Sequence, residues 1–170
     1  MQSLETKTSL TKLGLTLVAA LLVAVPTAIA ADPATEEARK AYREQVDPLC
    51  KSSTDNNSRI LKGVESQVNK GALVPAGKRF LRASEAFGKA VQKIVKVPRP
   101  SSDAARLGRW IDLLKEQQTL LRKIGQALKA EKESQARNHA GKLDRSNKRA
   151  NQEVFEFEFR HCEIDSSKFL

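Results

Sequence analysis

Helix-breaking residues are confined to a few short stretches of this chain, and this limits its fold more than any other feature. Between residues 76 and 157 the only prolines are Pro98 and Pro100. The segments around them repeat apolar residues at intervals of three and four, the period of an amphipathic helix. Strand-like alternation occurs clearly only near the end of the chain. These patterns predict an all-α fold in which four helices run up and down as a bundle.

The first helix is predicted to begin at Asp32-Pro33, because an acidic cap and a proline both suit a helix start. Apolar residues then recur at helical spacing, at Tyr42, Val46 and Leu49. Pro48 lacks a backbone N–H, so the helix either kinks there or restarts with Asp47 as its cap. A further apolar stripe consists of Ile60, Leu61, Val64 and Val68. It ends near Gly71, where GALVPAG is predicted to be the first loop.

The second helix is predicted from about Ala76 to Val97, and its two faces differ sharply. The apolar face carries Phe80, Ala83, Phe87, Ala90, Val91 and Ile94. The opposite face carries a single acid, Glu85, and the cations Lys78, Arg82, Lys89, Lys93 and Lys96. We expect the first face to pack in the core and the second to meet solvent or a ligand.

Two more helices follow the sequence VPRPSS, where Ser101 or Ser102 with Asp103 can cap the third. The third helix has the clearest period, with Leu107, Trp110, Ile111, Leu114, Leu121, Ile124 and Leu128. A turn is predicted near residues 129–134. The fourth helix then carries a thin stripe of mostly small residues, Ala136, Ala140, Leu143, Ala150, Val154 and Phe157.

The stretch NQEVFEFEFRHCEID, residues 151–165, alternates apolar and acidic residues like a strand. No second run alternates for long enough to pair with it, and an unpaired strand leaves its backbone groups unsatisfied. The fourth helix is therefore predicted to continue to about Phe157 and to fray before Cys162. The phenylalanines are expected to cover one end of the bundle.

The N-terminal segment is typical of an export signal. Lys7 and Lys12 precede an uncharged run, Leu13 to Ala30, whose last residues are small. Cleavage is predicted after Ala30. The alternative is an uncleaved membrane anchor, although the run is short for a span of about 20 residues. Cleavage would leave residues 31–170, the mature chain, as one helical-bundle domain in the periplasm, in the cell envelope or outside the cell.

The mature chain contains two cysteines, Cys50 and Cys162. An even count in an exported protein favours a disulfide over free thiols. In an up-and-down bundle the first and last helices are neighbours, so the bond can join them at one end. It would close a loop of more than 100 residues, for which chain entropy gives about 4 to 5 kcal/mol of stabilisation.

Three short motifs carry a resemblance. Tyr42 with DPLC at residues 47–50, the central PRPSSDAARLGRWIDLL and the terminal EFEFRHC resemble an uncharacterised group of small exported bacterial helical proteins. In that group, a tyrosine, aspartate and cysteine motif is matched by a final aromatic-glycine-aliphatic run that ends in a second cysteine. Here Pro48 falls inside the first motif, and Glu158 stands where the group has glycine. The resemblance implies a fold and a location and brings no activity.

Residues that would support catalysis are scarce. His139 and His161 are the only histidines. Glu163 and Asp165 follow His161, but a disulfide at Cys162 would remove the nucleophilic thiol. The same run makes a poor zinc site, because adjacent residues rarely converge on one ion. Glycine-rich phosphate loops and the motifs GxSxG and HExxH do not occur. The sequence predicts a protein that is not an enzyme and uses no metal or cofactor.

Aromatic residues support one functional hypothesis, since they line many small-molecule sites. A pocket between helices near Trp110 and Leu114 would make the protein a carrier or sensor. The alternative is that Trp110 and Tyr42 are ordinary core residues.

Net charge supports another hypothesis. The chain carries +10, of which residues 1–30 contribute +1 through Lys7, Lys12 and Glu5, so the mature chain carries +9. Outside the cytoplasm this charge favours an anionic envelope polymer, a membrane surface or an acidic partner protein. The candidate anion-binding residues are the five cations of the second helix together with Arg137, Lys142, Arg145 and Arg149 of the fourth. Nucleic acid is not predicted, because no aromatic residues are interleaved for base stacking. The alternative to a binding site is that these cations form a helix face that contacts only solvent.

Overall fold

The computed structural model describes residues 33–163. The predicted export signal, its cleavage site and the Asp32 cap lie outside these residues. The helices are α1 (Pro33–Leu61), α2 (Val64–Asn69), α3 (Leu73–Val95), α4 (Ala104–Lys129) and α5 (Glu133–Val154), with the 3-10 turns η1 (Ser101–Asp103) and η2 (Phe155–Phe157). Residues 33–163 contain no strand, which confirms the all-α prediction.

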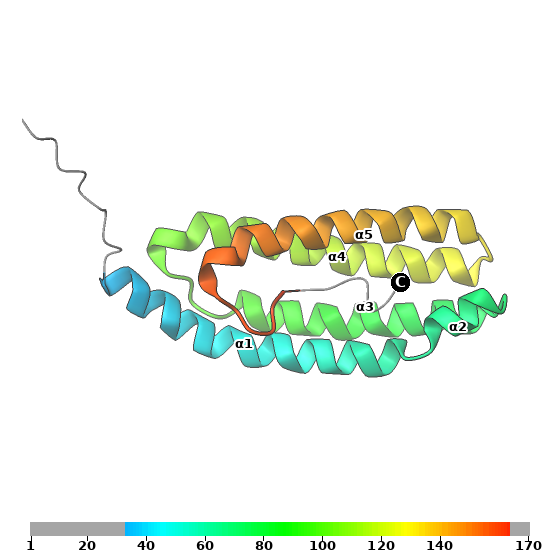
Figure 1. The fold of residues 1–170 in the computed structure, drawn as a ribbon, viewed down its shortest axis with the longest axis horizontal. Helices are drawn as coiled ribbons and strands as arrows, with labels where there is room; N and C mark the ends of the chain where they lie inside the picture. The colour runs from blue at the N-terminus through cyan, green and yellow to red at the C-terminus, as the bar shows by residue number, and fades with distance from the viewer. Residues whose placement is uncertain (1–32, 164–170) are drawn as a thin grey trace, which may run out of the picture. The chain divides into compact units, whose positions relative to one another are not determined.

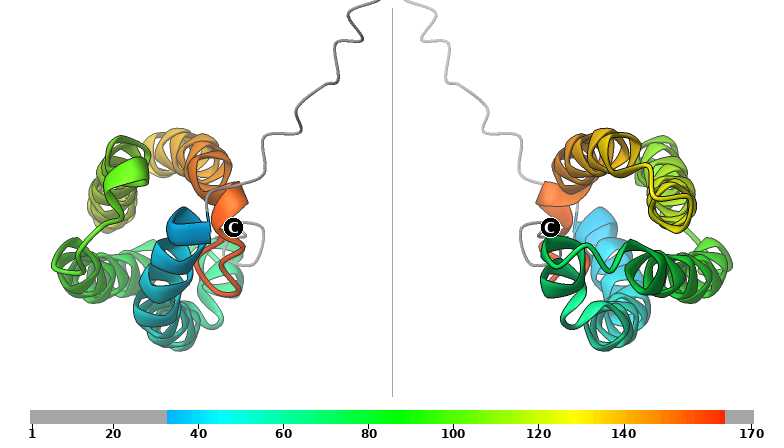
Figure 2. Two further views of the ribbon diagram at one scale, coloured as in Figure 1. Left: turned by 90° about the vertical axis from the view of Figure 1, so that its left-hand side faces the viewer. Right: turned by 90° about the vertical axis from the view of Figure 1, so that its right-hand side faces the viewer.

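The four long helices run up and down, as predicted (Figure 1). α1 packs against α3, α3 against α4, and α4 against α5. Viewed along the bundle, they occupy four corners, with α3 and α5 diagonally opposite each other (Figure 2). On the side between α1 and α5 lies the segment that follows α5. Residues 155–163 are called the C-terminal strap below.

Pro48 does not end the first helix. α1 continues through it as one helix of 29 residues, so the restart at Asp47 does not occur. The break comes later, at Lys62 and Gly63, where Gly63 adopts a φ of 79°. Glycine reaches this left-handed region without the steric cost of a Cβ atom. The chain then forms α2, a short helix that the continuous stripe toward Gly71 did not predict as a separate element.

α3 begins three residues earlier than predicted. Leu73, Val74 and Pro75 of the predicted loop belong to its first turn. Proline is tolerated there because the first backbone N–H groups of a helix have no partner within the helix. The loop is therefore only Lys70 to Ala72, with Gly71 at a φ of 75°.

A glycine pair sets the spacing of α3 and α4. A Cβ atom built on Gly77 would lie 2.7 Å from the backbone oxygen of Gly125, and one on Gly125 would lie 2.9 Å from the oxygen of Gly77. Such distances are too short for real Cβ contacts, so alanine at either position would push the helices apart. Gly125, a weak point by helix propensity, is explained by this close approach.

α4 is the centre of the core. Its whole predicted stripe is buried, and Leu107 and Trp110 are fully so. The turn into α5 falls at Ala130 to Lys132, inside the predicted range. On α5 the stripe of small residues is buried except at Ala140, which is half-buried.

The strap turns away from the helix axis at Glu158. α5 ends at Val154, η2 follows as far as Phe157, and Glu158 has a φ of 51°. Glycine adopts this left-handed backbone most easily, whereas Glu158 adopts it with a Cβ atom. Phe157 and Phe159 are buried, as expected for the end of the bundle, whereas Phe155 is 75% exposed.

A disulfide and a carboxylate attach the strap to α1. Cys50 and Cys162 are bonded, which confirms the predicted pair, with their Cα atoms 5.0 Å apart. Cys162 lies beyond the helical part of the C-terminal region. One turn earlier on α1, Asp47 accepts hydrogen bonds from the backbone N–H groups of Arg160, at 3.1 Å, and His161, at 2.9 Å. Asp47 therefore fixes the strap backbone beside the covalent bond.

Four aromatic rings, two of them from the strap, pack together where the strap meets α1 and α4. The Phe159 ring stacks on Trp110 at 5.6 Å between centroids and on Phe157 at 5.7 Å. Tyr42 meets both phenylalanine rings edge-on at 6.3 Å. Burial raises the pKa of Tyr42 to about 12, with an opposing effect of Arg99. Tyr42 is therefore a neutral core residue, and α1, α4 and the strap share one aromatic cluster.

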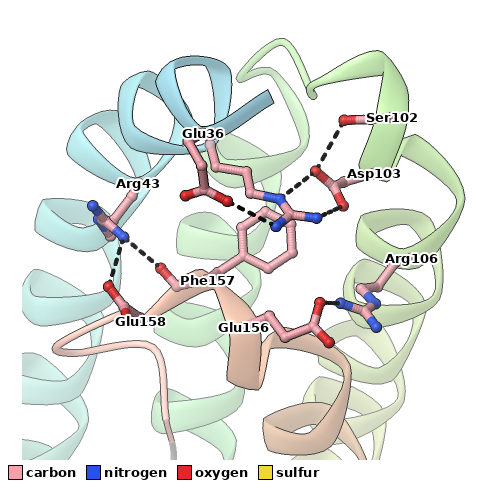
Figure 3. A network of polar contacts seen from close by, with 9 residues as sticks. Glu36, Arg43, Ser102, Asp103, Arg106, Glu156, Phe157 and Glu158 are labelled. Atoms are coloured by element: carbon pink, nitrogen blue, oxygen red, sulfur yellow. Dashed lines mark hydrogen bonds and ion pairs between the residues drawn. The ribbon is translucent and has the colours of Figure 1, made fainter. Parts of the chain in front are cut away.

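Ion pairs surround this cluster (Figure 3). Arg39 donates two hydrogen bonds of 2.8 Å to Asp103, and its guanidinium also lies over the Phe157 ring. These bonds hold the pKa of the Asp103 carboxyl below its usual value, despite burial, and raise that of Arg39. Arg106 pairs with Glu156, which ties η2 to α4. Each of these contacts joins segments that are distant in the sequence.

Candidate anion-binding groove

The five predicted cations of α3 lie on its exposed side. Lys78, Arg82, Lys89, Lys93 and Lys96 are all exposed. Within the described part of the chain, none of them forms an ion pair with a carboxylate. Their side chains are therefore open to contact by an anionic ligand, which would replace solvent ions.

Three of these cations line a groove between α3 and α1. The groove has a volume of about 410 Å³, and its α3 wall includes Arg82, Lys89 and Lys93. Its α1 wall presents two hydroxyl groups and an amide, from Ser52, Ser53 and Asn56. Guanidinium and ammonium groups thus face neutral hydrogen-bond donors across a concave surface. Both kinds of group bind phosphate or carboxylate oxygens.

The groove follows from the local sequence of each helix. On α3 the apolar residues face the core, so the cations must point outward. On α1 the residues of the polar stretch KSSTDNNS that line the groove, Ser52, Ser53 and Asn56, are too small to cover the neighbouring face of α3. Leu49 and Ala90 contribute apolar surface to the groove, and Glu85 contributes its acid. The lining therefore carries three positive charges and one negative charge.

The predicted cations of α5 belong to a different surface. Arg137, Lys142, Arg145 and Arg149 are exposed. Arg137 is paired with Glu133 at 2.6 Å. Because α5 lies diagonally opposite α3, the two rows do not form one continuous basic face (Figure 2). The groove therefore includes predicted cations from α3 and none from α5.

The α5 row still creates a positive environment. Burial lowers the pKa of His139, and the nearby Lys123 and Lys142 lower it further. His139 is therefore held neutral at pH 7. The neutral imidazole therefore adds no positive charge to the α5 surface.

Two of the residues considered for catalysis or metal binding, Cys162 and His161, take part in structural contacts of the strap. Cys162 is in the disulfide, so it offers no thiolate. His161 is exposed and holds Asp47 through its backbone N–H. Asp165 lies outside the described residues. Among residues 33–163, no three His, Cys, Asp or Glu side chains form a group suited to a metal ion.

Trp110 and Leu114, the two residues of the pocket hypothesis, pack in the core of the bundle. Trp110 is 0% exposed and is stacked on Phe159. Neither the α1–α3 groove nor the cavity near α2, described below, includes Trp110 or Leu114. Trp110 and Tyr42 are core residues here.

The sequence predicted the cations of the groove but did not predict the α1 residues on its opposite wall. Ser52, Ser53 and Asn56 belong to a polar stretch with no apolar period, and nothing in it indicates which side chains face α3. Their one sequence signal is the absence of large or charged residues at these three positions.

Comparisons with protein-family models, with curated proteins and with solved structures found no match to this chain. Over residues 33–163, no helix combines the length and the apolar character needed to cross a bilayer.

Proposed function

We propose that this chain is an exported, non-enzymatic helical domain that binds a linear phosphate-bearing polymer of the cell envelope in the groove between α1 and α3. The observation that carries the proposal is the row of unpaired cations on α3 facing hydroxyl and amide donors on α1. Export is supported by the N-terminal sequence and by the disulfide, which persists in oxidising compartments. The resemblance to small exported bacterial proteins agrees with this location.

The shape of the site favours a chain-like ligand over a flat membrane. Lys89 and Lys93 are one helical turn apart, about 6 Å along the axis, and Arg82 lies about two turns from Lys89. A polymer with regularly spaced phosphates can follow this row and reach Ser53 and Asn56 inside the groove. A bilayer surface meets the outermost ammonium groups and leaves the α1 wall without a partner.

The binding energy is expected to come mostly from released counterions. Each cation that contacts a phosphate contributes about one to the slope of log affinity against log salt concentration. The three groove cations therefore predict a slope of about three, and hydrogen bonds from the α1 wall add affinity that does not depend on salt.

The experiment measures retention of the chain on a linear glycerol phosphate polymer at several salt concentrations. K89Q with K93Q should lower affinity and reduce the salt slope by about two. K142Q with R145Q removes the same charge from α5 and is the matched control, for which a much smaller change is expected. S53A with N56A should weaken binding without changing the slope.

Three outcomes would contradict the proposal. Equal losses from the α3 and α5 pairs would show attraction by net charge alone. Preferential retention on anionic vesicles, with no effect of S53A and N56A, would assign the α3 face to a membrane surface. Stronger binding to polyglutamate than to the phosphate polymer would indicate an acidic protein as the partner.

A further inference from the structure

A second cavity lies at the opposite end of the bundle from the strap. It has a volume of about 370 Å³ and is lined by residues of α2, α3, α4 and α5. Phe80, Ile124 and Leu128 form its floor and are at most 3% exposed. Val68 and Ala140 are half-buried and lie at its opening. The volume falls within the range of small-molecule sites, roughly 300 to 1,000 Å³.

The small residues of α5 explain why this cavity is open. Ala136 and Ala140 face Val64 and Val68 of α2, so methyl groups stand where larger side chains would fill the space. The strap fills the side between α1 and α5 near Cys50 and Cys162, well away from α2 (Figure 1). The thin stripe on α5 therefore leaves an apolar hollow at one end.

Polar groups are limited to the rim of the cavity. They are Glu65 and Asn69 on α2, with Glu133 and Arg137 on α5. Glu133 and Arg137 pair with each other, so their charges offset. Glu65 has no ion-pair partner among residues 33–163, which gives the rim a net charge of about −1 on an otherwise basic protein. A carboxylate at the rim accepts hydrogen bonds and repels another anion.

We propose that this cavity binds a small amphiphile with one hydrocarbon chain and a hydrogen-bond-donating head such as a hydroxyl group. The chain enters between Val68 and Ala140 and lies on Phe80 and Leu128, and the head donates to Glu65. Each buried methylene adds to affinity through the hydrophobic effect. An anionic ligand of the same length is disfavoured at this rim, in contrast to the groove between α1 and α3.

The test uses N-phenyl-1-naphthylamine, an uncharged apolar fluorophore, with the full-length mature chain. The chain should enhance its fluorescence at one site. A140L narrows the opening and should weaken probe binding at least about tenfold, because three added carbons occupy part of the volume. A105L places the same side chain on an exposed position of α4 and should leave binding unchanged. Helical circular dichroism and the thermal midpoint check that A140L remains folded.

The head group is tested by displacing the probe with dodecanol or with dodecanoate. The native chain should prefer dodecanol. E65K should shift the ratio of the two affinities toward dodecanoate by about fivefold or more, because it reverses the rim charge. E37K makes the same change of charge on α1 and should leave the ratio as it is in the native chain.

Several results would overturn the proposal. One is an absence of probe binding, and another is equal binding by the native chain and by a folded A140L variant. An unchanged ratio of dodecanol to dodecanoate in E65K would remove the role of Glu65. If a chain ending at Glu163 bound the probe and the full-length chain did not, the cavity would be filled by residues 164–170 and would not be a ligand site.

Discussion

At one end of the bundle the strap fills the side between α1 and α5 with Phe159 and Cys162, whereas at the other end Val68 and Ala140 border an open cavity. α5 contributes to both ends. The difference lies in what packs beside it: at one end a covalently attached segment with two buried rings, and at the other alanine side chains of α5 that face valines of α2. Binding surfaces are expected where packing is incomplete, and stability where the chain is attached.

The contrast also explains why the strap is important for stability. α5 is poor in large apolar residues, so its own burial contributes little stabilisation. The strap compensates at one end with rings, a disulfide and the Asp47 hydrogen bonds. Four predictions test this division, from the largest expected effect to the smallest.

Removing a buried ring of the strap should have the largest effect. F159A is expected to lower the free energy of unfolding by about 4 kcal/mol, because the ring contacts Trp110, Phe157 and Tyr42. F80A removes the same group at the open end. It should cost less, about 3 kcal/mol, since the Phe80 ring borders a cavity. Urea denaturation followed by circular dichroism measures both, and a larger loss for F80A would invert the comparison.

Removing the disulfide should rank next. C50S with C162S is expected to lower the free energy of unfolding by about 3 kcal/mol, because the unfolded chain regains the freedom of a long loop. Reduction of the native chain with a phosphine should give a similar loss. An unchanged urea midpoint in both experiments would show that the bond does not stabilise this end.

The Arg39–Asp103 pair should contribute about 2 kcal/mol at neutral pH, as expected for hydrogen bonds to a charged group with little exposure. Because the folded-state pKa of Asp103 is lowered, this contribution is present above the unfolded-state pKa of 3.8 and is lost as the pH falls through the lower, folded-state value. The stability difference between native and D103N chains should therefore shrink below about pH 4.

Urea titrations at a series of pH values measure that difference. E36Q is the control, because Glu36 also bonds Arg39 but is exposed, and it should cost less than about 0.5 kcal/mol. A D103N deficit that stays constant down to pH 2 would contradict the assigned role of the charged carboxylate.

The Asp47 hydrogen bonds should have the smallest effect. D47A is expected to cost about 1 kcal/mol, since the Arg160 and His161 amides can bond to water instead. D47N keeps one acceptor oxygen and should recover part of the loss. Hydrogen exchange at these two amides should speed up in D47A. Unchanged exchange would mean that Asp47 does not hold the strap.

The sequence predicted the parts of the fold that depend on period and on cysteine count. The α4 stripe is buried because its spacing of three and four continues without interruption from Leu107 to Leu128, and the cysteine pair follows from an even count at the two ends of a bundle. Local propensity did not predict the backbone conformation where tertiary contacts determine it. Glu158 adopts a left-handed backbone that glycine would prefer, while Asp47 holds the amides just after it.

Only the α3 wall of the candidate groove was predicted from the sequence, for a similar reason. The α3 cations are visible because they alternate with a strong apolar face. Ser53 and Asn56 become part of the site only through the register of α1 against α3, which no pattern within α1 encodes. The cavity near α2 likewise depends on how four helices meet, and the sequence did not predict it.

The most direct test of the difference between the two ends is amide hydrogen exchange along α5. Residues 148–152, beside the strap, should exchange about tenfold more slowly than residues 138–142, which corresponds to a local stability difference of about 1.4 kcal/mol. In C50S with C162S this difference should fall toward zero. Equal exchange along α5 in the oxidised chain would contradict the account.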